Sequence, residues 1–318
     1  MKTFPILATL SAVAVLSLPP ARACSVCGCS LSSDWAAQGY PMMPGLQLGL
    51  RYEYFDQTDL RAGTRSVDRA ALEFPRDEEI QQHTLNRNTW LDLDYVASRR
   101  WGFVLQVPFH DRFHTTIDEG ETDLSASDAS GLGDLRVLAR WQKFTLSRSL
   151  GFQFGLKLPT GRFDQAFASG PTAGELLDRG LQLGTGTTDL LLGVSWFSRP
   201  TPRLGTFAQL QLDQPLAARD GFLPSASATL SGGFRWLNAT RFTPQLQLNV
   251  RWETREHGRE ADTPNSGNTL AYLSPGVTAG LGANTTAFVF VQLPVYQRVN
   301  GLQLEPHSLL TVGARFNL

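Results

Sequence analysis

The sequence has no long hydrophobic run beyond its first 18 residues, and it carries almost no net charge. None of its later apolar stretches reaches the ~18–20 residues that a membrane-spanning helix needs. The 28 Lys and Arg residues against 29 Asp and Glu give a net charge of −1, which excludes the basic field of a nucleic-acid-binding protein. Hydrophobic residues make up 42% of the 318 positions, too many for a disordered chain. No linker-like change of composition divides the chain, so we expect one large domain.

The usual sequence motifs of enzymes are also missing. There is no Gly-x-Ser-x-Gly elbow, no His-Glu-x-x-His pair and no phosphate-binding loop. The five histidines fall in predicted loops or at the edges of loops, where they form no catalytic arrangement. We therefore predict that the protein is not an enzyme.

The N-terminus has the features of an export signal. Lys2 supplies a positive start, residues 6–18 form a short apolar run, and Ala21-Arg22-Ala23 fits a processing site. Cleavage there removes residues 1–23 and leaves Cys24 at the mature N-terminus. We predict three segments: a signal peptide (1–23), a cysteine-containing segment (24–45) that lies in the periplasm or enters the rest of the protein, and a main domain (46–318).

Cysteine is scarce, and all three cysteines stand within six residues, at positions 24, 27 and 29. The spacing Cys-x-x-Cys-x-Cys lets three thiolates converge on one soft metal ion, such as Cu(I), or on a cluster or zinc. A small disulfide, Cys24–Cys27 or Cys24–Cys29, is a second interpretation, and acylation of Cys24 is a third. A c-type haem site is excluded because Gly28 stands where that site needs histidine. We take Cys24, Cys27 and Cys29 as candidate metal ligands.

Strand patterns dominate the rest of the chain, most clearly between residues 131 and 197. In residues 150–158, for example, the apolar Phe152, Phe154 and Leu156 alternate with Gln153, Gly155 and Lys157. Alternation with one apolar and one charged face is typical of strands whose outer face meets lipid and whose inner face meets water.

We predict twelve strands, near residues 46–56, 84–96, 101–109, 132–143, 150–158, 183–197, 204–213, 225–236, 242–253, 270–281, 285–295 and 307–318. The connections alternate between short turns and longer polar loops, and the strand number is even. Bacterial outer-membrane barrels have short periplasmic turns, longer external loops and both termini in the periplasm. The predicted fold class is therefore all-β: a transmembrane antiparallel β-barrel of about 12 strands, with a short irregular N-terminal segment that plugs it. A secreted β-sandwich also alternates, but it explains neither the loop lengths nor the aromatic residues near the strand ends.

Closing the sheet into a barrel turns its polar face inward, because lipid tolerates neither charges nor open strand edges. The predicted lumen-lining residues share this inward parity: Arg51, Glu53, Asp92, Asp94, Asp134, Arg136, Arg140, Lys157, Asp189, Asp213, Arg235, Arg251, Glu253, Arg315, Phe207, Phe288 and Phe290. Acids and bases are balanced among them, so we expect most of the charges to be paired in networks. The three phenylalanines form either an apolar strip for a ligand or a packing surface for an N-terminal plug.

A second group of metal-ligand residue types lies between residues 110 and 131. It contains His110 and His114 together with Asp111, Asp118, Glu119, Glu121 and Asp123. Because no helix is predicted here, the His-x-x-x-His spacing loses its meaning, and we expect an acidic external loop rather than a dedicated metal site.

Three short segments resemble a known family. Gly-Leu-Gly-Asp-Leu (131–135), Lys-Leu-Pro-Thr-Gly (157–161) and Leu-Gly-Thr-Gly-Thr-Thr-Asp (183–189) are similar to segments of the outer-membrane proteins grouped as the meta-pathway of phenol degradation family. The resemblance implies an outer-membrane channel or transporter for small hydrophobic or aromatic molecules. The cysteine segment keeps open an alternative function, in which the protein handles a soft metal ion or serves an electron-transfer partner.

These features also predict a location and partners. We expect the bacterial outer membrane, contacts with its lipid and lipopolysaccharide, a small-molecule solute, a periplasmic partner at the N-terminus, and no nucleic acid. The last strand, which ends in Phe316 and Leu318 on one parity, resembles the C-terminal signal that the barrel assembly machinery recognises.

Overall fold

The structure is a computed structural model that describes residues 31, 34–40, 42–145, 148–237 and 240–318. Its long strands are β1 (Gly45–Gly63), β3 (Ile80–Val96), β4 (Trp101–Ile117), β6 (Leu135–Phe144), β7 (Arg148–Leu158), β8 (Asp189–Thr201), β9 (Leu204–Pro215), β10 (Ser227–Trp236), β11 (Phe242–Glu253), β12 (Asn268–Gly280) and β13 (Thr285–Asn317). Two short strands, β2 (Arg65–Ser66) and β5 (Ser125–Leu132), and two single 3₁₀ turns, η1 (Arg69–Ala71) and η2 (Arg179–Leu181), complete the described elements.

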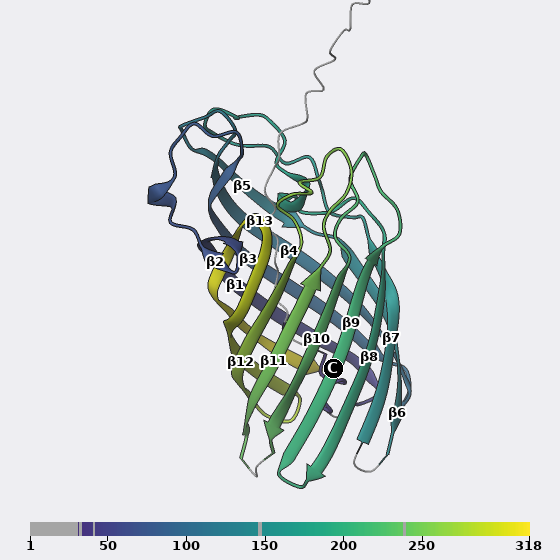
Figure 1. The fold of residues 1–318 in the computed structure, drawn as a ribbon. Coiled ribbons are helices and arrows are strands. Elements are labelled where there is room, and N and C mark those ends of the chain that lie inside the picture. The colour runs from purple at the N-terminus through teal and green to yellow at the C-terminus, as the bar shows by residue number, and fades with distance from the viewer. Residues whose placement is uncertain (1–30, 32–33, 41, 146–147, 238–239) are drawn as a thin grey trace, which may run out of the picture.

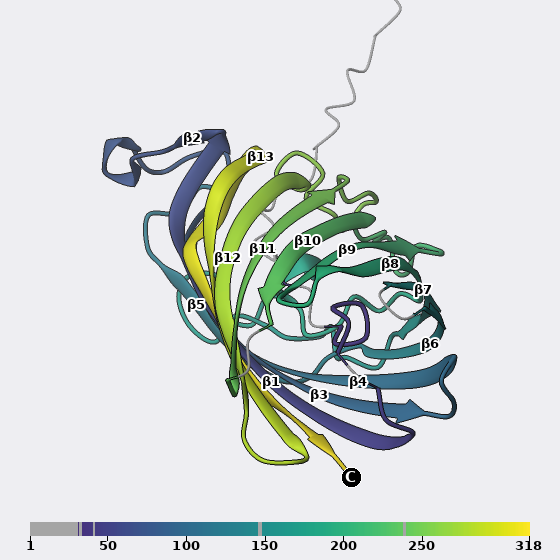
Figure 2. The ribbon, with the colours of Figure 1, turned by 90° about the horizontal axis from the view of Figure 1, so that it is seen from below.

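The strands form one closed antiparallel barrel (Figures 1 and 2). The long strands pair in chain order from β1 to β13, and the pairing of β13 with β1 closes the ring. β13 is long enough to supply two sides: its residues 286–299 pair with β12 and its residues 299–317 pair with β1. The eleven long strands therefore make twelve passes along the wall, and the predicted fold class is confirmed.

The polarity of the wall is inverted relative to a water-soluble barrel. On β7 the side chains of Phe152, Phe154 and Leu156 are exposed on the outside, whereas Lys157 is buried inside. Exposed aromatic residues gather near the strand ends, including Tyr95, Trp101, Trp196, Trp236 and Trp252. An apolar outer band with aromatic girdles is the arrangement that lipid requires of a β-barrel. No described helix has the length and apolar character to cross a membrane.

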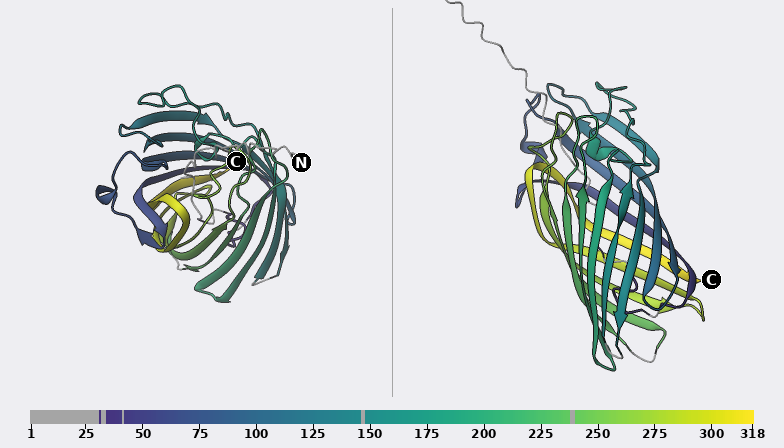
Figure 3. Two further views of the ribbon diagram at one scale, coloured as in Figure 1. Left: turned by 45° about the horizontal axis from the view of Figure 1, so that its top comes forward. Right: turned by 90° about the vertical axis from the view of Figure 1, so that its right-hand side faces the viewer.

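The two ends of the barrel differ in the way predicted from the loop lengths. At one end, lowest in Figure 1, five connections of two to five residues join β3 to β4, β6 to β7, β8 to β9, β10 to β11 and β12 to β13. At the other end the connections between long strands contain 11 to 30 residues, and they gather over the mouth (Figure 3). The C-terminus lies at the short-connection end, where the Leu318 amide donates to the carbonyl of Leu46 at 3.0 Å.

Two predicted loops are instead β-structure, and these predictions were wrong. β5 pairs with the upper half of β4 inside the expected loop 110–131, because β6 reaches only the lower half of β4 and leaves the rest unpaired. The expected loop 296–306 is the continuous hairpin of β13, which turns at Gly301 with φ of +57°. The extended ends of β1, β3 and β13 are held together there by a small hydrophobic core of Leu60, Ile80 and Leu304.

The inverted wall yields a stability prediction. Val194→Arg places a charge on the outer face near the middle of β8, where Val194 is 37% exposed, and should destabilise the barrel by about 2–4 kcal/mol in lipid. Gln211→Arg, next to it on the inner face, should cost far less because Gln211 lines the cavities of the polar interior. Urea unfolding in lipid vesicles, followed by electrophoretic mobility, measures both. Equal losses would contradict the assignment of the two faces.

Candidate functional site

The lumen contains two adjoining cavities. The upper cavity, toward the long loops, has a volume of about 330 Å³, and the lower cavity has about 80 Å³. Gln106 and Gln211 line both cavities, so they mark the narrowing between them.

The structure places the predicted lumen residues in three groups: around the upper cavity, around the lower cavity, and outside both. The upper cavity is lined by Arg51, Glu53, Asp134, Arg136, Lys157, Asp189, Asp213, Arg251 and Glu253. The lower cavity is lined by Asp92, Asp94, Arg140 and Arg315. The remaining four, Arg235, Phe207, Phe288 and Phe290, lie outside both cavities.

Most lumen charges are paired within the wall. Arg51 Nε lies 3.0 Å from Glu53 Oε1, and Arg140 contacts both carboxylate oxygens of Asp94 at 3.1 and 3.2 Å. Arg251 pairs with Glu253 and Lys157 with Asp189. Paired charges behind an apolar wall avoid the cost of an isolated buried ion, so they stiffen the barrel and leave a nearly neutral polar surface.

The three segments that carry the family resemblance meet at one point of the lumen wall. Asp134 Oδ1 accepts the Gly161 amide at 3.0 Å, and Asp134 Oδ2 accepts the Thr185 amide at 2.9 Å and the Thr185 hydroxyl at 3.0 Å. Lys157 donates to the Thr185 hydroxyl at 2.9 Å. We call Asp134, Lys157, Gly161, Gly184 and Thr185 the Asp134 junction. It ties the start and the end of loop 159–188 to the beginning of β6.

The glycines of the Asp134 junction allow a close backbone approach. A Cβ atom on Gly184 would lie 2.6 Å from both Asp134 Oδ1 and the Gly161 carbonyl oxygen, and one on Gly161 would lie 2.7 Å from the Cα of Gly184. No other residue type fits at either position unless neighbouring atoms move. The close approach therefore explains why both positions are glycine.

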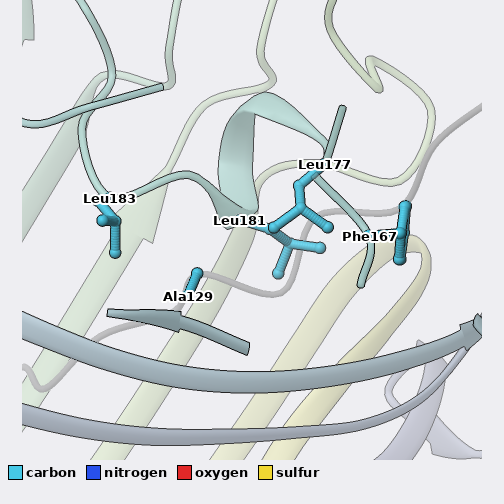
Figure 4. Close-up of a cluster of buried hydrophobic side chains, with 5 residues drawn as sticks. All are labelled: Ala129, Phe167, Leu177, Leu181 and Leu183. Carbon is cyan, nitrogen blue, oxygen red and sulfur yellow. The ribbon is translucent and has the colours of Figure 1, made fainter. Parts of the chain in front are cut away.

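Loop 159–188 folds inward over the upper cavity and is fixed there by an apolar cluster. Ala129 of β5 packs with four residues of the loop, Phe167, Leu177, Leu181 and Leu183 (Figure 4). Arg112 on β4 also donates to the Leu181 carbonyl at 2.6 Å. The cluster and this hydrogen bond hold η2 inside the mouth, so the loop narrows the entrance.

Residues 34–40 lie inside the barrel, near its short-connection end (Figure 2). The Asp34 carboxylate accepts the amides of Ala36 and Ala37 at 2.9 and 3.1 Å and also accepts a hydrogen bond from Gln153 on β7. The backbone turns back at Gly39, where φ is +76° and the ring of Phe197 leaves no space for a Cβ atom. This turn is therefore held from the β7–β8 side of the wall.

Aromatic and cationic side chains of β10 and β13 also hold residues 34–40. Arg235 stacks on the Tyr40 ring at 3.4 Å from its centroid and donates to the Gln38 carbonyl at 2.7 Å. The Trp35 ring packs edge-on against Phe288 at 5.4 Å, and Arg315 lies over it. Burial raises the pKa of both Asp34 and Tyr40 because it disfavours the charged form of each side chain.

The predicted phenylalanine strip lies at this level, beside residues 34–40. Phe288 contacts Trp35, while Phe207 and Phe290 are 3% exposed. Gly233 and Gly276 provide the space for the rings of Phe207 and Phe290. Packing against the N-terminal segment therefore accounts for Phe288, the alternative that the sequence left open.

Several residues of the upper cavity were missed by sequence reasoning. Trp90 shares the inward parity of Asp92 and Asp94, and that signal could have found it. Arg179 and Phe222 come from the loops, where no parity exists, and the Arg179 guanidinium stacks on the Phe222 ring at 5.0 Å. Only the folded loops bring these two residues to the cavity.

The two histidines between residues 110 and 131 do not lie in the acidic external loop that the sequence predicted. His110 and His114 lie on β4 rather than in a loop, and they bind Asn88 and Thr84 at 2.8 Å; Asp111 alternates to the other face and pairs with Arg87. Within the part of the chain that the structure describes, no group of three or more His, Cys, Asp or Glu side chains could hold a metal ion. Cys24, Cys27 and Cys29, the predicted ligands of a soft ion, lie outside the described residues, as does the signal peptide.

The close packing at the Asp134 junction can be tested with one added methyl group. Gly184→Ala should destabilise the protein by about 1–3 kcal/mol, because backbone atoms of Gly161 and the Asp134 carboxylate must move. The matched control is Gly232→Ala, where the nearest atom is 3.7 Å from the added Cβ and little change is expected. Thermal unfolding in detergent and proteolysis of loop 159–188 are the measurements. Equal behaviour of the two variants would show that the junction is not tightly packed.

Comparison with known proteins places the fold. No family model and no curated protein sequence matches the chain. Among solved structures, the barrel is similar to an outer-membrane channel from Pseudomonas putida F1, with a TM-score of 0.62, 13% sequence identity, and coverage of 87% of this chain and 96% of that chain.

Two other solved barrels are more distant. They are the translocator domain of the autotransporter NalP from Neisseria meningitidis (TM-score 0.49, 8% identity, 89% and 91% coverage) and the Pseudomonas putida toluene transporter TodX (TM-score 0.45, 9% identity, 89% and 93% coverage). Likeness at these TM-scores is too loose to compare sites. The chain thus has the fold of an outer-membrane β-barrel channel, while membership of the phenol-degradation family stays a prediction.

Proposed function

We propose that the protein is a passive channel of the bacterial outer membrane for small organic molecules, closed at its lower end by residues 34–40. The observation that carries the proposal is the order of features along the lumen. The long loops open on the upper cavity, Gln106 and Gln211 join it to the lower cavity, and Asp34 and Trp35 line the lower cavity. Short turns face the periplasm in bacterial barrels, so a solute moving down this path enters from outside and meets residues 34–40 last.

The wall supports a channel rather than an enzyme. Its charges are neutralised by partners on the wall itself, and its hydrogen-bonding groups line a continuous polar surface that suits passage. The similar solved barrel is described as a channel.

Apolar side chains in the lumen are relevant to the proposed hydrophobic or aromatic solutes, because they offer a surface that such molecules can contact. Trp35 packs against Phe288, whose ring lies 6.2 Å from that of the buried Phe290. When residues 34–40 leave, these rings face the path opposite the charged wall. We therefore propose that the open channel presents an apolar strip and a polar face together, which suits organic molecules with both kinds of surface.

The plug predicts a conductance change. Replacing Trp35 and Tyr40 together by Ala removes the aromatic contacts with Phe288 and Arg235, each worth about 0.5–1.5 kcal/mol, and should raise the open fraction about tenfold. Planar-bilayer recording of the full chain measures this. Met43→Ala, three residues after Tyr40 at an exposed side chain, is the control and should behave as wild type. Closed double-variant channels would contradict the plug.

The raised pKa of Asp34 predicts a pH dependence. Because the carboxyl has a higher pKa when docked than its ordinary value of 3.8, docking takes up a proton and is strongest at low pH. Docking weakens as pH rises through the pKa of the docked Asp34. Among the neighbouring charges, Arg140 lowers this pKa and Asp94 raises it, and Arg315 also lies near Asp34. Conductance should therefore rise with pH above about 4.

Asp34→Asn keeps an oxygen acceptor for the amides of Ala36 and Ala37 but cannot titrate. Its conductance should be flat over the same pH range. A wild-type profile that falls with pH, or a variant that keeps the wild-type slope, would refute the role of Asp34.

A further inference from the structure

One ion pair at the narrowing joins parts of the wall that are not neighbours. Arg136 stands on β6 and Asp213 on β9, with β7 and β8 between them in the sheet. The Arg136 Nη2 and Asp213 Oδ2 atoms are 3.7 Å apart, and both residues line the upper cavity. Arg136 is the register partner of Gln106, which lines both cavities, so the pair lies where the two cavities join.

The pair is loose. Its separation exceeds hydrogen-bonding distance, and the two side chains are 35% and 23% exposed. Asp213 Oδ1 is buried and accepts no hydrogen bond from the described residues. Partly exposed pairs of this kind contribute about 0–1 kcal/mol, so a better partner from solution can replace either member.

The Arg136 guanidinium lies over the ring of Trp90, which serves as its platform. The guanidinium carbon of Arg136 lies 5.5 Å from the centroid of the Trp90 ring, and that of Arg51 lies 5.0 Å from the same centroid. The Trp90 indole donates to Glu53 at 3.1 Å, and Glu53 also pairs with Arg51, so the ring is fixed. A guanidinium stacked on a ring keeps its N–H donors in its own plane, directed past the ring edge.

Geometry rather than net charge favours an anion at Arg136. The neighbouring Lys157, its register partner on β7, pairs with Asp189 and lies 3.8 Å from Asp134, so the charge of Lys157 is already compensated. Asp213 has no comparable platform, and the charge of Asp189 lies near it. A carboxylate from solution gains a bidentate contact with the fork of Arg136, whereas a cation must compete with that guanidinium for Asp213.

We propose that Arg136, stacked on Trp90, is a binding site for the carboxylate of a small organic acid, which takes the place of Asp213 as the solute passes between the cavities. The inference rests on the proposed channel function and names its solute class. The incoming carboxylate compensates Arg136 in place of Asp213, and the displaced, partly exposed Asp213 adds a negative charge at the narrowing that helps the anion leave again.

The test uses three probes of one shape: benzoate, neutral benzamide and cationic benzylammonium. Calorimetry on the folded full chain in detergent should detect benzoate binding and much weaker binding of the other two. Arg136→Gln should weaken benzoate binding about tenfold, and Arg136→Lys, which keeps the charge but not the fork, should fall between. Asp213→Asn removes the competing carboxylate and should tighten benzoate binding. The control is Arg162→Gln, on an exposed loop arginine paired with Asp164.

The outcomes separate the two proposals. Unchanged benzoate affinity in Arg136→Gln, weaker affinity in Asp213→Asn, or preferential binding of benzylammonium overturns the carboxylate site. Each variant is first checked for the heat-dependent mobility shift of a folded barrel, and Arg136→Lys keeps the test decisive if Arg136→Gln does not fold. Benzoate binding that depends on Arg136, without solute flux through the Trp35/Tyr40 double variant, upholds the site and overturns the channel.

Discussion

Every strand of this barrel depends on the pairing between β1 and β13. Hydrocarbon offers no hydrogen bonds, so a sheet edge within it would leave a row of unpaired N–H and C=O groups, each costing several kcal/mol. The register from Gln47↔Asn317 to Gly63↔Val299 removes both edges at once. It also continues above the barrel, where Leu60 and Leu304 bury each other, so the closing seam is longer than the wall itself requires.

Closure determines what the interior must be. With the apolar side chains facing lipid, the inward half of each strand is polar, and those groups need partners from the wall, from loops or from the N-terminal segment. All three sources are used: Asp94 with Arg140 on the wall, Arg112 with the Leu181 carbonyl of a loop, and Arg235 with the Gln38 carbonyl of residues 34–40. The loops and the N-terminal segment that provide partners for the inward-facing polar groups also narrow the lumen.

These partners differ in how easily they exchange. The Asp134 junction is locked by backbone packing at Gly161 and Gly184, where no Cβ atom fits, so loop 159–188 behaves as part of the wall. Residues 34–40 are held by side-chain contacts, among them an aspartate whose pKa is raised by burial. The Arg136–Asp213 pair is weaker still, because it is long and partly exposed. The proposed solute path uses these differences: the wall stays fixed, residues 34–40 leave, and the Arg136–Asp213 pair is replaced.

The sequence by itself determined the barrel, because its information is periodic. A side chain's face follows from the period of two, so the polar parity predicted an interior that includes Asp94, Lys157 and Arg251, and the alternating connection lengths predicted which end carries the loops. Only the tertiary structure decided the rest. β5 forms inside an expected loop because β4 extends beyond its pairing with β6. Arg179 lines the cavity from a loop, where side chains do not alternate between two faces. Arg136 pairs with Asp213 although two strands lie between them. Such contacts depend on the curvature of the closed wall and on how the loops fold into it, and neither is encoded in the spacing of residues along one strand.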